Sequence, residues 1–239
     1  MLPRAPLVAA LLVAGLVFAA CSPGDAVEPL SEEVVPPEPP SPPGVLIELD
    51  VADLPQGFSR TPNNLYNNIP SYLREHDDSI LSSLGTRSRF ENTRLGEGFQ
   101  NTAQDRFIFV VSITLQDEQT AVAVLGHIGT RTLTDVFNLF APDDELFEAE
   151  RLEDPPRPGD ALHYFFRHGV LSEGRVTLET TTDLVILASG GTISFIQGSA
   201  PVGTGASRIT SELLALSELV SQRLAAAYQI AVAEALEGG

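Results

Sequence analysis

The C-terminal part of the chain carries a stripe of apolar residues at helical spacing, and this stripe limits the folds that the chain can adopt. Its members recur every three or four residues and are Ile209, Leu213, Leu216, Val220, Leu224, Ala227 and Ala231. This spacing predicts one long amphipathic helix, with Ser207 as its N-cap and Gly238-Gly239 after its end. The apolar face of such a helix has to be buried, so the rest of the chain must supply a surface that covers it.

Alternating apolar residues predict that this surface is a β-sheet. Residues 107–115 place Phe107, Phe109, Val111, Ile113 and Leu115 on one face, which indicates a central strand. Four short segments rich in β-branched and aromatic residues follow, at 162–168, 175–180, 183–188 and 192–197, and turn-forming residues separate them. They predict an antiparallel meander, with Thr181-Thr182 as one of its turns. Residues 45–51 and 87–91 are weaker strand candidates for the same sheet.

The remaining patterns predict further helices and one loop. Residues 118–128 and 133–140 indicate an interrupted helical region, and residues 71–84 indicate another helix. The acidic, proline-containing stretch 141–160 indicates an exposed loop. Strands and helices mixed with a meander predict an α+β fold, in which an antiparallel sheet is covered by the long C-terminal helix and by one or two further helices.

The N-terminus predicts where the protein resides. Arg4 supplies a short positive region, and residues 5–20 form an apolar run of the length found in secretory signals, shorter than a comfortable membrane span. The run ends in two small residues, Ala19 and Ala20, directly before Cys21, which is the single cysteine of the chain. A lone cysteine in an exported chain has no disulfide partner within that chain, which favours its use for lipid attachment.

The segment from Leu16 to Cys21 resembles the lipobox of bacterial prolipoproteins, although Phe18 stands where that family most often has leucine. The resemblance implies cleavage after Ala20, acylation of Cys21 and a lipid-anchored protein of the bacterial cell envelope. Two or three acyl chains would hold the protein stably on a membrane. The alternatives are an ordinary cleaved signal peptide with a coincidental cysteine, or an uncleaved signal anchor.

A proline-rich tether follows the signal peptide. Residues 22–44 contain eight prolines and no aromatic residue. Counted from Cys21, the tether would span roughly 25 Å as a flexible coil and about 75 Å as a polyproline helix. We therefore expect a signal peptide over residues 1–20, a lipidated cysteine with a linker over 21–44, and a single α+β domain over 45–239.

The charge of the chain argues against some partners. Thirty-two acidic residues face 14 basic ones, all of them arginine, and the net charge is −18. Such a chain repels nucleic acid and anionic lipid, so phosphate-backbone binding is not expected. On the polar side of the predicted C-terminal helix, Glu212, Glu218 and Glu234 outnumber Arg208 and Arg223, which also disfavours anionic membranes as its partner.

The four histidines do not form a catalytic or metal-binding motif. His163 and His168 lie five residues apart on a predicted strand, so their side chains are expected on opposite faces. His76 precedes two aspartates on a predicted helix, where adjacent residues diverge, and His127 falls at a helix boundary. We therefore expect no metal site and no cofactor.

Other patterns for chemistry are equally weak. A Gly-x-Ser-x-Gly elbow is absent, and the paired carboxylates fall in the predicted acidic loop. Residues 198–207 form a glycine-rich connection that matches neither dinucleotide nor nucleotide motifs. Arg87 and Arg89 would face the same way on a strand, which makes them the best candidates for contacting an anion.

The order of these elements, with the segment Asp53-Leu54-Pro55-Gln56-Gly57-Phe58 near the start of the domain, resembles small extracytoplasmic α+β domains of bacterial lipoproteins and PsbP-like proteins. The resemblance implies a binding or assembly module rather than an enzyme, and it transfers no functional residue.

Three functions therefore stand in order. The first is a membrane-anchored lipoprotein with a non-catalytic binding or assembly domain that contacts a protein partner. The second is a carrier that holds an apolar ligand between the sheet and the long helix, in a cavity lined by residues such as Phe107, Phe109, Phe165, Phe195 and Leu216. The third is a hydrolase in which His163 or His168 lies beside a serine or a carboxylate in a cleft.

Overall fold

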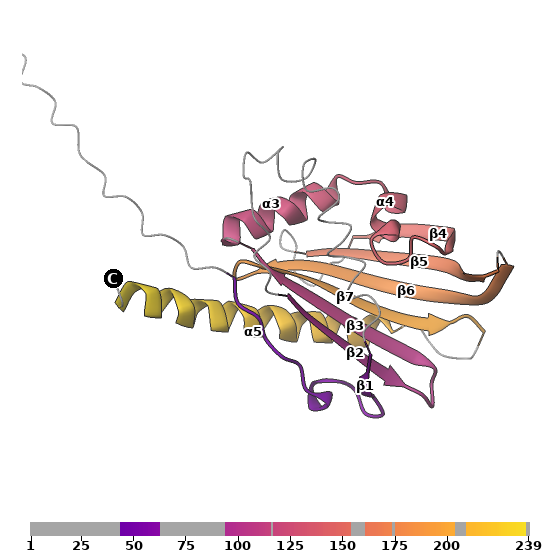
Figure 1. Ribbon diagram of the computed structural model, residues 1–239, viewed down its shortest axis with the longest axis horizontal. Coiled ribbons are helices and arrows are strands. Elements are labelled where there is room, and N and C mark those ends of the chain that lie inside the picture. The colour runs from indigo at the N-terminus through magenta and orange to yellow at the C-terminus, as the bar shows by residue number, and fades with distance from the viewer. Residues whose placement is uncertain are drawn as a thin grey trace, which may run out of the picture. The chain divides into compact units, whose positions relative to one another are not determined.

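The computed structural model describes residues 44–62, 94–115, 117–153, 161–173, 175–203 and 209–237. These residues form an α+β fold in three layers, with α3 and α4 on one face of an antiparallel sheet and α5 on the other (Figure 1). The elements are η1 (Val51–Asp53), β1 (Ser59–Thr61), β2 (Arg94–Asn101), β3 (Arg106–Thr114), α3 (Glu118–Gly129), α4 (Leu133–Asn138), β4 (Glu145–Leu152), β5 (Ala161–Ser172), β6 (Arg175–Ser189), β7 (Thr192–Pro201) and α5 (Thr210–Glu237). The predicted fold class is confirmed.

The described part of the sheet has the strand order β1-β2-β3-β7-β6-β5-β4, and every neighbouring pair is antiparallel. Strands β4 to β7 form a meander that ends beside β3, which places β3 and β7 in the middle of the sheet. The predicted meander is thus confirmed, and the predicted central strand at 107–115 is β3.

The predicted turn at Thr181-Thr182 is wrong, because β6 continues through both threonines. Thr181 pairs with Ala200 and Thr182 with Ser199 on β7. The hydroxyl of Thr181 donates to the carbonyl of Ala200, and the hydroxyl of Thr182 contacts that of Ser199. Threonine is β-branched and suits a strand, so these polar residues extend the strand rather than end it.

The predicted loop at 141–160 is also wrong over part of its length, because Glu145–Leu152 forms β4. This strand pairs with β5 at the edge of the sheet. Leu146 and Ala149 pack against the core below α3 and α4, whereas Glu148 and Glu150 remain exposed. A bulge between Leu146 and Glu148 interrupts the alternation of apolar and polar residues that would indicate a strand. Charged side chains are also common on edge strands, so the acidic composition does not distinguish this strand from a loop.

Each face of the sheet has its own apolar core. Helix α3 buries Val124, Leu125 and Ile128 against one face, and α4 adds Val136 and Phe137. Helix α5 covers the opposite face and buries much of its predicted apolar stripe there, namely Leu213, Leu216, Val220 and Leu224. The helices predicted at 118–128, at 133–140 and at the C-terminus are therefore confirmed, and α5 lies on the sheet as expected.

A tight turn at Gly190-Gly191 joins β6 to β7 and lies against α5. Both glycines have positive φ angles, 55° and 71°, as the central residues of a two-residue hairpin turn of type I′ require. A Cβ added at Gly190 would lie 2.6 Å from the Cβ of Tyr228 and 2.9 Å from the carbonyl oxygen of Leu224. Glycine therefore allows both the turn and the close approach of α5.

The predicted strand at 45–51 is wrong, and residues 44–53 form an irregular strap that ends in η1. Its first described residue, Gly44, donates a hydrogen bond to the carbonyl of Leu115. The amide of Leu49 bonds to the carboxylate of Glu97 instead of to a strand. Leu49 and Leu54 enter the core under α5, so burial holds the strap without ladder pairing.

Several predictions fall outside the described residues. These are the signal peptide, Cys21 and the tether, the helix at 71–84 with His76, the strand at 87–91 and the N-cap Ser207. The glycine-rich connection 198–207 is partly described, and its first four residues belong to β7. Strands β1 and β2 were not predicted. Strand β2 contains two glycines and no β-branched residue, so its pattern does not indicate a strand.

Candidate functional site

The predicted anion contacts, Arg87 and Arg89, and the predicted lipidation site at Ala20 and Cys21 lie outside the described residues. The described part of the chain contains three features that a function can use. They are two histidine-centred polar networks inside the fold, a charged clamp on the strap, and an exposed apolar surface at one end of the sheet.

The two histidines of β5 lie on opposite faces of the sheet, as predicted. His163 faces the α5 side, where its Nε2 lies 3.3 Å from Oδ1 of Asp183. The other oxygen of that carboxylate accepts a hydrogen bond of 3.1 Å from the hydroxyl of Thr210 in the first turn of α5. His163 and Asp183 are both almost fully buried, so this network joins β5, β6 and α5 within the fold.

His168 lies on the opposite face and belongs to a longer chain of hydrogen bonds. Its Nδ1 lies 2.8 Å from Oδ2 of Asp144, and its Nε2 lies 3.0 Å from the hydroxyl of Thr182. The hydroxyl of Ser199 lies 2.9 Å from that of Thr182. The Ser199 hydroxyl also accepts a hydrogen bond from the side-chain amide of Gln197. The rings of Phe137 and Phe140 pack edge-on against the imidazole.

Asp144, His168 and Thr182 are hydrogen-bonded in the order acid, imidazole, hydroxyl, as in a catalytic triad. The surroundings of these three side chains nevertheless favour a structural role. The side chain of Thr182 is fully buried, and its hydroxyl is already bonded to Ser199. Burial lowers the pKa of His168 and outweighs the opposite effect of Asp144, which favours the neutral imidazole. A nucleophile must reach its substrate, and a buried threonine that is hydrogen-bonded on both sides does not.

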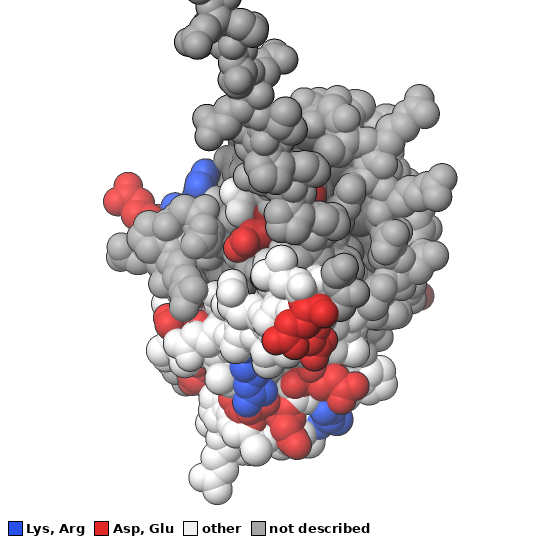
Figure 2. Space-filling model, turned by 90° about the vertical axis from the view of Figure 1, so that its left-hand side faces the viewer, with Lys and Arg blue, Asp and Glu red and all other residues white. Residues whose placement is uncertain are grey.

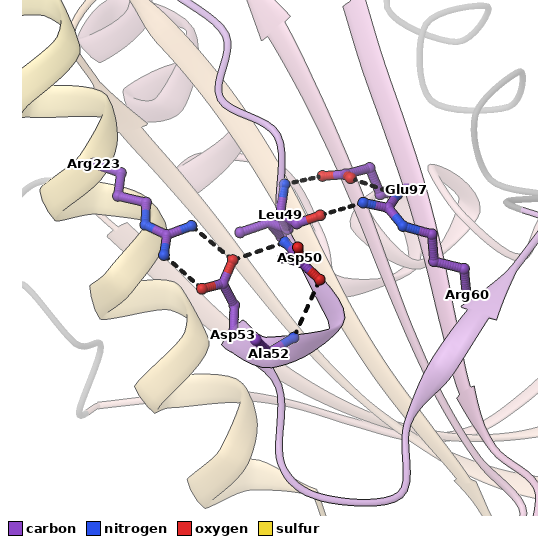
Figure 3. Close-up of polar contacts among 7 residues, drawn as sticks. All are labelled: Leu49, Asp50, Ala52, Asp53, Arg60, Glu97 and Arg223. Carbon is purple, nitrogen blue, oxygen red and sulfur yellow. Dashed lines mark hydrogen bonds and ion pairs between the residues drawn. The ribbon is translucent and has the colours of Figure 1, made fainter.

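The charged clamp fixes the strap to the rest of the domain (Figure 3). On one side, Glu97 of β2 accepts the amide of Leu49 at 2.9 Å and an Arg60 guanidinium hydrogen bond at 3.1 Å, while Arg60 also donates to the carbonyl of Leu49. On the other side, Arg223 of α5 donates two hydrogen bonds to Asp53. The strap is therefore held between α5 and the sheet by paired charges.

Burial and charge act in opposite directions on the two carboxylates of the clamp. Burial raises the pKa of Glu97 above its ordinary value, although the Leu49 amide and Arg60 both oppose the shift. The hydrogen bonds from Arg223 hold the pKa of Asp53 below its ordinary value, and burial only partly opposes them. Asp53 therefore remains ionised at neutral pH, as a two-point pair with an arginine requires.

The residues predicted to line a carrier's cavity do not face one space. Phe195 lies in the core under α3 and α4, whereas Leu216 lies in the core under α5. Phe107 and Phe109 are half-buried and stack on each other, 6.2 Å apart, on the face opposite α5. The predicted lining set is thus divided by the sheet, and that part of the prediction is wrong.

Exposed apolar side chains gather around the end of the β5–β6 hairpin. The side chains of Phe147 on β4 and Val176 on β6 meet over Gly169 of β5. A Cβ added at Gly169 would lie 2.8 Å from each of them. Leu171 pairs directly with Val176 and shares its face. We call Phe147, Leu171 and Val176 the hairpin patch. Their exposed fractions are 42%, 37% and 43%.

The hairpin patch lies on the α5 face of the sheet but beyond the start of α5. Helix α5 begins at Thr210, which bonds to Asp183, and the patch lies nearer the β5–β6 turn than Asp183 does. The strap begins at the opposite end of β6, where Gly44 lies beside Gly191. Figure 1 shows the two ends on opposite sides of the molecule. The 15 residues of β6 span roughly 45 Å between them.

Acidic side chains are spread over the end of the molecule where α5 finishes, with a few basic ones between them (Figure 2). Among the residues that the structure describes, no three histidine, cysteine or acidic side chains lie close enough to hold a metal ion. The same residues include no helix with both the length and the apolar character needed to cross a membrane.

Sequence reasoning missed the clamp and the hairpin patch. Asp53 begins the segment that carries the resemblance to PsbP-like proteins, but nothing in its pattern indicates a partner in α5. The patch residues belong to strands, where an apolar side chain is ordinarily read as core. Among the described elements of this face, α5 begins too far from the β5–β6 turn to cover them.

Comparisons with known proteins add little to this description. No protein-family model matches the chain, and no curated protein matches its sequence. A solved structure of a point mutant of the protein Mog1 is similar at a TM-score of 0.29 and 16% sequence identity, over 53% of this chain and 73% of that one.

Proposed function

We propose that this chain is a lipid-anchored, extracytoplasmic protein whose domain is a non-catalytic binding or assembly module. The observation that carries the proposal is the arrangement of β6, which separates the start of the strap from the hairpin patch. A chain tethered through Cys21 enters the domain at one end and has an exposed apolar surface at the other. Exposed apolar patches are typical of interaction sites.

The internal networks support binding rather than catalysis. His163 and His168 each lie beside a carboxylate, as a hydrolase would require, but both are buried and form hydrogen bonds within the fold. Thr182, the hydroxyl nearest His168, is also buried. These groups join strands and helices, which supports a structural role for both histidines.

The packing under α5 supports a binding surface rather than an internal carrier site. Leu213, Val220 and Leu224 are at most 1% exposed and contact sheet residues such as Val185 and Ile196 in one closed core. Close packing of this kind fills the space where an apolar ligand would lie. Native mass spectrometry tests this directly, since a small-molecule mass that is lost on denaturation would contradict the proposal and favour a carrier.

Lipid anchoring is tested by labelling cells with a radioactive fatty acid. We expect the full chain to take up the label and to sediment with membranes, and Cys21→Ser to do neither after its signal is cleaved. Ser31→Ala in the tether is the matched control and should behave as the wild type. A cleaved Cys21→Ser chain that stays on membranes would contradict the anchor.

The binding role is tested by photo-crosslinking in intact cell envelopes. A photoreactive amino acid is placed at Leu171 or Val176 in the hairpin patch, and at Val122 on α3 or Ile230 on α5 as exposed positions elsewhere. A binding module gives discrete protein adducts at one or more of these positions. The absence of adducts at all four would contradict the proposed function.

A further inference from the structure

We infer that the hairpin patch is the docking surface for a partner protein whose contact surface is apolar at its centre and basic around it. This inference rests on the proposed function, since it names the surface and the partner chemistry of the binding module. It is carried by two independent observations, the exposed apolar side chains and the charges that surround them.

The apolar part of the surface is exposed, and none of the helices and strands that the structure describes covers it. Gly169 has no side chain, and Phe147 and Val176 occupy the space above it, as the 2.8 Å distances from an added Cβ show. Leu171 extends this surface toward the turn. In addition, Val202, whose amide bonds to the carbonyl of Glu179, is 43% exposed at the same end of the sheet. A partner that buries these side chains removes apolar area from water.

The charges at the edge of the patch leave it net acidic. Arg167 lies two residues before Gly169 on the same face and pairs with both Glu148 and Glu179. One arginine is therefore matched by two glutamates. The exposed Glu145 and Glu150 of β4 and Glu173 in the turn add negative charge, and the exposed Arg175, which pairs with Ser172, adds one positive charge. Five glutamates and two arginines therefore surround the patch. The potential at this surface attracts a basic partner.

The same charges disfavour other occupants. A second copy of this chain has the same net charge of −18 and meets the patch with a like-charged surface. An anionic lipid surface is repelled for the same reason, and the patch lies at the end of β6 away from the strap. A protein with a basic rim satisfies both the apolar and the charged part of the surface.

The experiment uses the full chain in a mild non-ionic detergent and a defined probe. The probe is a peptide of alternating lysine and leucine that carries one photoreactive phenylalanine, and a glutamate–leucine peptide of equal length is its control. Crosslinked residues are identified by mass spectrometry. The protein variants are Leu171→Ser with Val176→Ser in the patch, Val122→Ser as an equally exposed control on α3, Glu179→Gln beside the patch, and Glu234→Gln on α5.

We expect the lysine peptide to label the hairpin patch and its surroundings, and the glutamate peptide to label them at least tenfold less. The patch variant should lose labelling at least tenfold, while Val122→Ser should retain it. Glu179→Gln should weaken labelling and its dependence on salt, and Glu234→Gln should change neither. If the double variant does not fold, Leu171→Ser alone is tested, because this side chain lies at the outer end of the patch.

Equal labelling of the wild type and the patch variant would overturn the inference, as would labelling spread over the whole acidic surface. Failure of the inference can be separated from failure of the proposed function by the crosslinks in cell envelopes. Adducts at Val122 or Ile230 without adducts at Leu171 or Val176 would overturn the docking surface but leave the binding module intact.

Discussion

Arg223 of α5 donates two hydrogen bonds to the carboxylate of Asp53, a residue 170 positions earlier in the chain (Figure 3). The pair holds the strap against the core under α5 and joins the start of the domain to its last helix. Because α5 also covers the sheet, Asp53 connects the strap to the helix that closes this face of the fold.

Removing this pair should cause a small loss of stability. The side chain of Arg223 is 40% exposed, so water screens the pair and Arg223→Ala should lower the free energy of unfolding by about 0.5–1 kcal/mol. Arg223→Lys should recover only part of the lost free energy of unfolding, because lysine cannot make the two-point contact. Thermal melts at neutral pH check this, with Arg175→Ala, at an exposed arginine of β6, as the control.

The same pair should have a defined pH dependence. The folded-state pKa of Asp53 lies below its ordinary value of 3.8, so its contribution is fully present above that value and is lost as the pH falls through the lowered pKa. The stability difference between wild type and Arg223→Ala should therefore be constant from pH 7 to pH 5 and shrink below pH 3.8. A constant difference down to about pH 2.5 would show that the ion pair does not cause it.

His168 should make the fold less stable in mild acid. Burial lowers its folded-state pKa below the ordinary value of 6.5, so its contribution is fully present above pH 6.5 and is lost as the pH falls toward the lowered pKa. We expect His168→Asn to be less stable at neutral pH, with a flatter stability profile between about pH 7.5 and 5.5. Chemical denaturation at a series of pH values checks this, and parallel profiles would contradict the buried neutral imidazole.

The turn at Gly190 should not accept a side chain. Alanine there combines an unfavourable positive φ with an overlap on the backbone of α5, and we expect a loss of about 2 kcal/mol or more. Gly126→Ala is the matched control, because an added Cβ in α3 meets nothing within 4 Å and alanine favours helices. The control should be slightly more stable than the wild type. Equal melting temperatures for the two variants would contradict the close packing of α5.

Ser112 and Ser194 should show strong coupling. Their hydroxyls lie 2.8 Å apart between β3 and β7, and both are buried. Replacing one serine with alanine leaves the other hydroxyl without this partner, at a cost of about 1–2 kcal/mol, whereas replacing both removes the unsatisfied group. A double-mutant cycle in denaturant should find the double variant at least as stable as either single one. Strict additivity would show that the two hydroxyls are not coupled.

The elements whose residues follow a regular period can be predicted from the sequence alone. The stripe from Leu213 to Leu224 predicted α5, and the alternation from Phe107 to Ile113 predicted β3, because burial on one face imposes these spacings. The sequence also predicted that His163 and His168 face opposite ways, since an odd separation on a strand has that result.

The pairing of distant residues, and how much of each sheet face a helix covers, follow from tertiary packing and not from any local pattern. No local pattern joins Asp53 to Arg223 or Asp144 to His168, because these contacts depend on how the chain returns to the same place. The acidic pattern of β4 predicts a loop rather than a strand, because an edge strand needs few apolar residues and is protected by charge. Helix α5 starts at Thr210, beside Asp183, and so does not reach the hairpin patch, because the point at which a helix begins depends on the packing of the whole fold.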